Sequence, residues 1–366
     1  MKYRTLPRGG ERVSEIGLGL AKIHEAGEDG VRAALKTALG AGINFFDLCC
    51  TEKNVYRLFT ETVGEKRGEV FTQMHLGCAY PEGQYAHIHD KDEIIAAFED
   101  TLAFSGDTYA DCGMFHCVDE EAEFESIVAA NGLLDYALGL KKQGALRHVG
   151  VSTHTPAVAR KFMDTDEIDL IMFSVNPAYD YTKGDWAGGS HEERLALYNE
   201  AERRGVALSV MKPFAGGQLL DSDRSPLNVT LSRFQCLRYA LDRPAVVTCL
   251  PGVTGEADVK ALLGFEDADP ADTDYSVMAK AAPAEAKGRC VYCNHCAPCP
   301  AGIDIGLVNK YYDLAVAGDG LAAEHYKKLS LNADDCESCG HCDNHCPFGV
   351  DQSGRMEEIA AWFAGR

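Results

Sequence analysis

The chain carries a concentration of thiols near its end. Eight of its 15 cysteines fall in two short runs, "CVYCNHCAPCP" and "CESCGHCDNHCP", and each run ends in proline. The N-terminal residues lack the apolar stretch of a secretion signal, so we expect a cytoplasmic, reducing setting. In that setting clustered thiols serve as metal ligands or catalytic groups before they form disulfides. The two runs therefore predict a bound metal.

The spacing within each run indicates which metal. The second run follows C-x2-C-x2-C-x3-C-P, the pattern of 4Fe-4S ligands in bacterial ferredoxins, and the first is one residue shorter before its last cysteine. Paired C-x2-C motifs also bind zinc, but two four-thiol runs that end in proline match zinc fingers poorly. Three closely spaced thiolates wrap one cluster, whereas the cysteine before proline is placed to reach the other. We therefore expect two 4Fe-4S clusters, one on Cys290, Cys293, Cys296 and Cys346 and one on Cys336, Cys339, Cys342 and Cys299.

Ahead of the cysteine runs, short apolar segments alternate with amphipathic ones, which predicts repeated strand–helix units. The predicted strands cover 15–20, 43–47, 70–76, 111–116, 148–152, 170–176, 207–213 and 246–252. The predicted helices cover 29–40, 54–64, 91–104, 121–143, 156–163, 191–204, 227–241 and 256–264. Eight such units favour an α/β fold, a (β/α)8 TIM barrel. A doubly wound sheet is the alternative, which the lack of G-x-G-x-x-G after the first strand disfavours.

The rest of the chain divides into a linker and a small module. Residues 266–288 are acidic and rich in alanine and proline, which predicts a linker. Between the cysteine runs, 305–318 and 320–331 have helical spacing. We therefore expect a barrel over 1–265, an acidic linker over 266–288, and a mainly helical dicluster ferredoxin-like domain over 289–366.

Polar side chains stand where the predicted barrel strands end. Asp47, His75 and His116 end three successive strands, and active sites of such barrels lie at the carboxyl ends of the strands. A single histidine there would usually be a hydrogen-bonded core residue, but two beside an aspartate predict acid–base chemistry. Later strand ends and the turn after the last strand add Ser152, Asn176, Lys212 and residues 251–255.

These residues also carry a resemblance. The segments "RTLPRGGERVSEIGLG", "AGINFFD", "GVST", "VMKPFAGGQL" and "LPGVTGEADV" resemble the aldo/keto reductase family, in the same order, from about residue 1 to 265. The cysteine module resembles the subgroup of that family with a C-terminal 4Fe-4S ferredoxin-type domain. The resemblance implies a barrel that reduces carbonyls with NADPH through an Asp, Tyr, Lys and His tetrad.

Only half of this tetrad is present. Asp47 and His116 match the family Asp and His, whereas Glu52 stands at the Tyr position, with Tyr56 nearby, and His75 stands at the Lys position. We expect His75, held by Asp47 or Glu52, to donate the proton that Tyr supplies in the family, a role worth about 10²–10⁴-fold in rate. His116 would polarise the carbonyl.

The expected cofactor site is also altered. Ser152 and Asn176 match groups that bind the nicotinamide carboxamide in the family, but Met172 replaces a glutamine and Met211 the stacking aromatic. The last turn lacks the family's Lys and Arg for the NADPH 2′-phosphate and carries acidic residues instead, which favours NADH if nicotinamide binds. Backbone N–H groups there would cradle a pyrophosphate. The predicted cofactor-binding residues are Ser152, Asn176, Lys212, Gly252, Val253 and Thr254.

Two further cysteines, Cys49 and Cys50, follow Asp47 directly. Small apolar packing is the favoured interpretation. A reactive thiol is one alternative, and a metal site with His75 and His116 is another.

The net charge and the expected cofactors together limit the classes of function that are possible. The formal net charge is −21, which excludes nucleic acid because phosphate contacts need clustered Lys and Arg, and no apolar run is long enough for a membrane span. We expect an oxidoreductase that acts on a small, carbonyl-related substrate, with two clusters relaying electrons to or from a ferredoxin- or flavodoxin-like carrier. An NAD(P)H-dependent carbonyl reductase with structural clusters, and a non-catalytic barrel that serves as an electron-transfer scaffold, are the alternatives.

Overall fold

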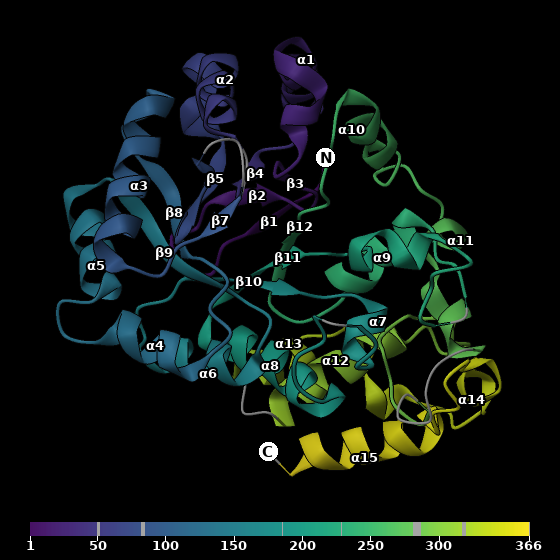
Figure 1. Cartoon of the computed structure of the whole chain (residues 1–366). Helices are drawn as coiled ribbons and strands as arrows, with labels where there is room; N and C mark the ends of the chain where they lie inside the picture. Colours follow the sequence, from purple (N-terminus) through teal and green to yellow (C-terminus); the bar gives the residue numbers. More distant parts are fainter. Residues whose placement is uncertain are drawn as a thin grey trace.

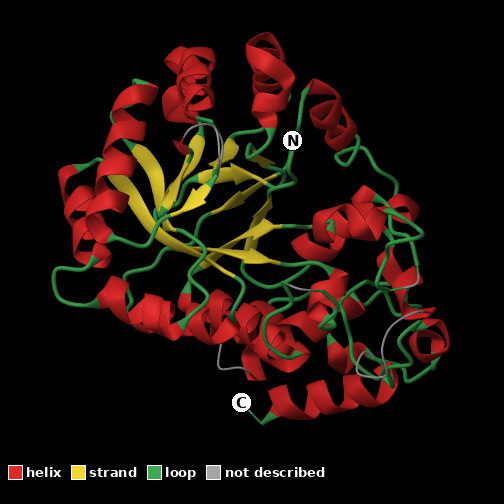
Figure 2. Ribbon diagram, in the orientation of Figure 1, coloured by secondary structure: helices red, strands yellow, loops and turns green. Residues whose placement is uncertain are grey.

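The computed structural model describes residues 1–49, 52–81, 85–184, 186–227, 229–280, 287–316 and 320–365. Within them, eight parallel strands curve into a barrel with helices outside it (Figures 1 and 2). In spatial order the strands are β3 (Leu18–Gly19), β4 (Phe45–Leu48), β5 (Phe71–Leu76), β8 (Ala110–Phe115), β9 (Leu146–Thr153), β10 (Leu170–Ser174), β11 (Ala207–Met211) and β12 (Val246–Cys249). Backbone pairing of Ile16 with Cys249 and of Gly19 with Gly252 closes the ring. The predicted TIM barrel is confirmed.

Most residues of the barrel strands are buried, because helices cover the strands outside and side chains fill the barrel inside. Every residue of β5 and of β8 is buried, as expected for parallel strands covered on both faces. The covering helices are α1 (Gly27–Gly40), α2 (Lys53–Val63), α3 (Lys91–Ser105), α4 (Glu121–Val128), α5 (Leu133–Gln143), α6 (Pro156–Asp164), α8 (His191–Arg204), α9 (Arg233–Leu241) and α10 (Glu256–Leu263). Two of them, α8 and α9, begin with capping boxes at Ser190 and Ser232.

Two predicted helices are wrong in their extent. The segment predicted over 227–241 is helical only over α9, Arg233–Leu241. The segment 121–143 forms two helices, α4 and α5, rather than one. Between these two helices the backbone at Gly132 passes close to the end of α4, so that an added Cβ there would lie 2.4 Å from the Ile127 carbonyl oxygen. Only glycine permits that approach, so the amphipathic period continues while the helix does not.

Two small antiparallel pairs complete the barrel. The pair β1 (Tyr3–Thr5) and β2 (Arg12–Ser14) precedes the first barrel strand. The other, β6 (Cys78–Ala79) and β7 (Ala86–His87), follows β5 directly and therefore stands at the carboxyl ends of the strands. Gly77 makes this turn with φ +112°, and an added Cβ there would lie 3.3 Å from His116 Cβ. The hairpin thus lies against the strand end that carries His116.

The C-terminal module is mainly helical and packs on the barrel helices. It contains α12 (Ile305–Val316), α13 (Gly320–Lys327), α14 (His341–His345) and α15 (Gln352–Ala364), and α12 lies beside the barrel helix α8 (Figure 1). Val291, Phe348 and Val350 of this module are buried in the main core. The buried Arg243, just after α9, donates to the Val291 carbonyl at 2.5 Å and ties the two parts together.

The segment between barrel and module is ordered where it is described. Residues 270–280 form α11 (Pro270–Thr273) and η5 (Tyr275–Lys280), and Tyr275 and Met278 are buried in the main core. Residues 281–286 of the proposed linker lie outside the described residues. Among the described helices, none is both long and apolar enough to cross a bilayer.

Candidate active site at the barrel mouth

The ends of β4, β5 and β8 bring Asp47, His75 and His116 into one hydrogen-bonded chain. His75 Nε2 lies 2.9 Å from Asp47 Oδ1, and His75 Nδ1 lies 3.0 Å from His116 Nδ1. All three side chains are buried. The three residues that the sequence placed at successive strand ends are therefore neighbours, because parallel neighbouring strands end at the same rim.

The surroundings separate the two histidines electrostatically. Burial by itself would lower the pKa of His75, but the charge of Asp47 and its hydrogen bond outweigh burial and raise that pKa. Burial, together with the nearby charge of His75, lowers the pKa of His116 to about 3. His116 is thus a neutral imidazole at neutral pH, and His75 is the histidine of the pair whose charged form the surroundings favour.

A second polar layer holds Asp47 in place. Gln73 Nε2 donates to Asp47 Oδ1 at 2.9 Å, and Ser209 Oγ donates to Gln73 Oε1 at 2.7 Å. Sequence reasoning missed Gln73, although a signal existed. It lies two residues before His75 on β5, so both side chains point to the same face of the strand.

Glu52 and Tyr56 do not join this chain. Glu52 is the residue before α2 and is half-buried. Within the described ranges, no hydrogen bond or ion pair links its side chain to Asp47 or His75. Tyr56 is buried, and its hydroxyl donates to the Leu48 carbonyl at 2.7 Å. Neither residue therefore takes up the place of the tetrad tyrosine beside His75.

Tyr85 contacts the site from a loop. Its hydroxyl lies 2.8 Å from His116 Nε2, although 47% of the side chain is exposed. No pattern in the sequence pointed to it, because its position depends on the β6–β7 hairpin rather than on a barrel strand.

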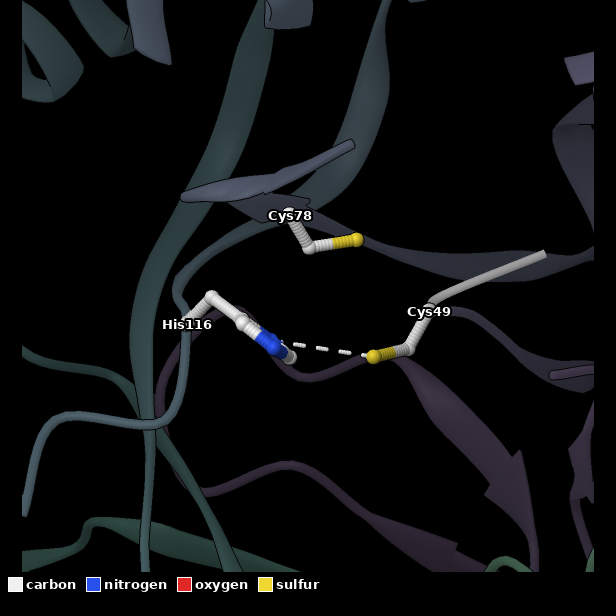
Figure 3. A group of neighbouring side chains, drawn as sticks. All are labelled: Cys49, Cys78 and His116. Carbon is white, nitrogen blue, oxygen red and sulfur yellow. Dashed lines mark hydrogen bonds between the residues drawn. The ribbon is translucent and has the colours of Figure 1, made fainter. Parts of the chain in front are cut away.

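Two cysteines stand on the other side of His116. Cys49 Sγ lies 3.7 Å from His116 Nδ1. Cys78, at the start of β6, offers a second sulfur, and the two sulfurs and the imidazole nitrogen lie within 4.8 Å of one another (Figure 3). Cys50, which was considered with Cys49, lies outside the described residues. Both described cysteines are half-buried and polar in their surroundings, which does not fit the apolar packing expected for Cys49.

A second charged group lines the mouth at the ends of β9 and β11. His154 Nδ1 lies 2.9 Å from Asp119 Oδ2, and His154 Nε2 lies 2.8 Å from Lys212 Nζ. Burial opposes ionisation of Asp119, but hydrogen bonds from His154 prevail and lower its pKa to about 2. Lys212 has φ +53°, in the left-handed region, and its ammonium lies 4.6 Å from the centre of the Trp186 ring. Such strain in a non-glycine residue is typical of functional sites.

The residues expected to bind nicotinamide are partly engaged with the protein itself. Asn176 Nδ2 donates to the Lys212 carbonyl at 2.9 Å, and Asn176 Oδ1 accepts from Tyr179 N at 2.9 Å. Asn176 therefore shapes the loop after β11. Ser152 is buried at the end of β9, opposite Met172 on β10.

The loop after β12 is a poor phosphate site. Both the backbone N–H and the hydroxyl of Thr254 donate to Asp258 Oδ2, at 2.8 and 2.7 Å. Glu256 accepts from Thr37 Oγ1 at 2.7 Å and pairs with Lys260. These carboxylates stand at the start of α10, where the family's phosphate would bind, and they repel anions. Gly252, with nothing within 4 Å of an added Cβ, leaves its backbone accessible. The set does not fit the 2′-phosphate of NADPH.

The module's eight cysteines form two groups. One small cavity is lined by Cys299, Cys336, Cys339 and Cys342. The other group consists of Cys296 and its neighbours Cys290, Cys293 and Cys346. Burial and electrostatic repulsion from these neighbouring thiolates raise the pKa of Cys296 to about 12. In each group, three cysteines come from one run and the fourth is the pre-proline cysteine of the other run.

The backbone around these thiols fits an iron–sulfur group. Val350 N donates to Cys346 Sγ and Ser338 N to Cys336 Sγ, both at 3.4 Å. Tyr292, Asn294 and Ser338 between the cysteines have φ of 62°, 55° and 48°, in the left-handed region that tight loops adopt. Hydrogen bonds to sulfur of this kind surround iron–sulfur clusters and tune their potentials.

Comparisons with known proteins agree with this architecture. The family model described as "Aldo/keto reductase family" matches residues 15–235, and that described as "4Fe-4S dicluster domain" matches 289–351. The holo form of the aldo-keto reductase AKR11C1 from Bacillus halodurans is similar at 20% identity and TM-score 0.61, over 78% of this chain and 97% of that one. An aldo/keto reductase from Brucella melitensis matches at 18% identity and TM-score 0.53, over 76% and 98%. No curated protein sequence matches the chain. At these identities the solved structures support the fold alone.

Proposed function

Because the chain belongs to the aldo/keto reductase family and carries a 4Fe-4S dicluster domain, we propose that it is an iron–sulfur oxidoreductase acting on a small, carbonyl-related substrate at the barrel mouth. One observation carries the proposal: the continuous chain Asp47–His75–His116 at three adjacent strand ends. A barrel kept only as a scaffold has no need of a buried carboxylate and two imidazoles joined in this way, since burying them costs free energy.

We infer a role for each residue of the hydrogen-bonded chain. The two facing Nδ1 atoms of His75 and His116, 3.0 Å apart, can both approach one substrate oxygen. Reduction of a carbonyl takes two electrons, one from each cluster when bound, and two protons. His75 donates the proton that goes to oxygen, and solvent water supplies the proton that goes to carbon. Asp47 holds the His75 ring and stabilises its charged form. His116, which stays neutral, orients and polarises the carbonyl. Glu52, although it stands at the family's tyrosine position, takes no part in this step.

We propose that the two cysteine groups hold one 4Fe-4S cluster each, which when bound would supply one-electron transfer to the substrate site. Two cysteines of the first group, Cys293 and Cys346, pack against the main core, whereas the described core contacts of the second group, through Cys299, Cys336 and Cys342, are with the module's own small core, which also contains Cys296. Cys339 of the second group is exposed. The exposure of Cys339 favours the second group as the one that exchanges electrons with an external ferredoxin- or flavodoxin-like carrier.

In this proposal the clusters are the main source of electrons, and a nicotinamide cofactor is secondary. The acidic residues at the start of α10 disfavour a phosphate on the ribose, so NADH is the nicotinamide that these residues favour. A carbonyl reductase with purely structural clusters would need tight NADPH or NADH binding without the family's stacking aromatic, since Met211 stands in its place.

The test is turnover by the anaerobically purified, iron-loaded protein with a reduced viologen dye and a panel of aldehydes, ketones and conjugated carbonyls. His75→Gln should lower turnover by about 10²–10⁴-fold. The matched control is His325→Gln, on the exposed face of α13. Equal activity in wild type, His75→Gln and the control would contradict a catalytic mouth.

A further inference from the structure

We propose that Cys49, Cys78 and His116 bind one Zn²⁺ ion at the barrel mouth, separate from the iron–sulfur ligands. The three side chains arrive from different segments, the end of β4, the start of β6 and the end of β8, and converge on one point (Figure 3). Binding of the ion is independent of the function proposed above. The role given to the ion below rests on that function.

The distance between Cys49 and His116 agrees with a tetrahedral site, and Cys78 lies within reach of it. With Zn–S near 2.3 Å and Zn–N near 2.0 Å, a tetrahedral ion separates its sulfur and nitrogen ligands by about 3.6 Å. Cys49 Sγ and His116 Nδ1 are 3.7 Å apart, and the sulfurs and the nitrogen all lie within 4.8 Å of one another. Thiolates and imidazole together select zinc, whereas magnesium and calcium require oxygen ligands.

The second ring nitrogen of His116 has the partner that a metal-binding histidine needs. His116 Nε2 lies 2.8 Å from the Tyr85 hydroxyl, which fixes the ring and leaves Nδ1 facing the two sulfurs. The barrel supplies the rest of the support. Gly77, with its φ of +112°, turns the chain from β5 into the hairpin and so carries Cys78 to His116.

His75 stands beside the fourth position. Its Nδ1 lies 3.0 Å from His116 Nδ1, and its Nε2 is held by Asp47. Two cysteines and one histidine, with a fourth position for water or substrate, form a ligand set of catalytic zinc sites. In the proposed reaction the carbonyl oxygen of the substrate would coordinate the ion, which would polarise the carbonyl bond. His116 would then act through the metal. His75 would then protonate that oxygen, and the ion would undergo no redox change.

A neighbouring group of similar composition does not fit a metal. Cys117, Asp119 and His154 also lie within 4.8 Å of one another. However, the neighbour of His154 is the Lys212 ammonium, 2.8 Å from His154 Nε2, which stays charged at neutral pH and repels a cation, whereas the neighbour of His116 is the His75 imidazole, which can be neutral. Cys117 therefore provides a matched control: a half-buried cysteine at the same rim, outside the proposed site.

The experiment measures zinc and its neighbours in the full-length protein, purified anaerobically with its iron content intact. Elemental analysis should find about one zinc per chain, and X-ray absorption at the zinc edge should show two sulfurs at about 2.3 Å with nitrogen or oxygen completing four ligands. The zinc edge is blind to iron, so the clusters do not interfere. Four sulfur neighbours would place the zinc in the cysteine runs, and a zinc-free protein after growth in added zinc would show no site. Either result overturns the proposal.

Variants locate the ion. Cys78→Ser and Cys49→Ala should each lose most of the zinc while iron content and the circular dichroism spectrum stay as in wild type. Cys117→Ser should keep the zinc. Loss of zinc from Cys117→Ser, with retention in Cys78→Ser, would contradict the assignment. If Cys78→Ser fails to fold, titration of the metal-depleted wild type with Co²⁺ decides, because thiolate ligands give a charge-transfer band whose absence counts against the site. Zinc bound at this site in a protein that turns over no substrate would leave the site standing and refute the proposed function instead.

Discussion

His75 and His116 face each other through their Nδ1 atoms across 3.0 Å, while the far side of each ring is held by a different partner, Asp47 for His75 and Tyr85 for His116. The pair thus presents two nitrogens to one small space at the mouth of the barrel. The tetrad of the family is not simply lost at this position. One replacement, His75 at the lysine position, is hydrogen-bonded to both of the retained members, Asp47 and His116.

Tyr85 is expected to act by positioning His116. Tyr85→Phe removes the hydroxyl that lies 2.8 Å from His116 Nε2. We expect turnover to fall by about 10-fold to 100-fold, the usual effect of removing a partner that orients a ligand or catalytic imidazole. Zinc affinity should weaken in the same variant. Steady-state kinetics and zinc content, compared with those of the control Tyr3→Phe, measure both effects. Unchanged values in Tyr85→Phe would remove Tyr85 from the site.

The crossed arrangement of the cysteine runs predicts an unequal outcome for double variants. Cys346→Ser should reduce the iron content from about eight to about four per chain by removing the first cluster. Adding Cys290→Ser to it should cause little further loss, whereas adding Cys336→Ser should remove the second cluster too. Iron analysis and electron paramagnetic resonance of the reduced proteins measure these losses. The reverse pattern would show that each run binds its own cluster.

The acidic loop predicts the order of nicotinamide affinities. Calorimetry should show that NADH binds more tightly than NADPH, because Asp258 and Glu256 stand where the 2′-phosphate would lie. Asp258→Asn should reduce the difference in affinity between NADH and NADPH, since the substitution removes a negative charge and keeps the shape and hydrogen-bonding capacity of the side chain. Tighter binding of NADPH to the wild type would contradict this account of the loop.

A buried histidine away from the mouth makes stability depend on pH. Burial by itself lowers the pKa of His148, but hydrogen bonds to Asp169 and Glu11 outweigh burial and raise it. Lys141 and Arg8 also pair with Asp169. Because the folded-state pKa is raised, this stabilisation is fully present below the ordinary histidine value, about 6.5, and is lost as pH rises through the folded pKa.

The thermal unfolding midpoint of wild type should therefore fall with rising pH above neutrality by more than that of His148→Gln. The control His325→Gln should follow the wild type. Parallel curves for wild type and His148→Gln would show that His148 contributes nothing to the pH dependence.

The sequence predicted the barrel well because each strand–helix unit has its own local pattern. The eight strands appear in the predicted order, and Asp47, His75 and His116 meet because parallel strands end at a common rim. The prediction of one helix over 121–143 was wrong because the helix is interrupted before Gly132, while the amphipathic period of the sequence continues through the interruption.

The parts of the site that the sequence missed depend on tertiary arrangement. Cys78 and Tyr85 reach His116 from the hairpin after β5, whose path over the mouth has no local signature. The Asp119–His154 pair joins two βα loops from neighbouring strands. Glu52 was selected by alignment with the family, but it is the residue before α2, and among the described residues no hydrogen bond or ion pair links its side chain to His75. Matching a position in a motif therefore predicted less here than matching a strand end.

The most direct test of the central claim is the reoxidation of the reduced clusters by substrate, followed by stopped-flow absorbance under anaerobic conditions. The reduced wild-type protein, mixed with the carbonyl compounds of the panel, should be reoxidised by at least one of them. His75→Gln should react with that compound about 10²-fold or more slowly with the same iron content. Clusters that stay reduced with every compound, or that are reoxidised equally fast in His75→Gln, would contradict the claim that electrons from the clusters reach chemistry at the barrel mouth.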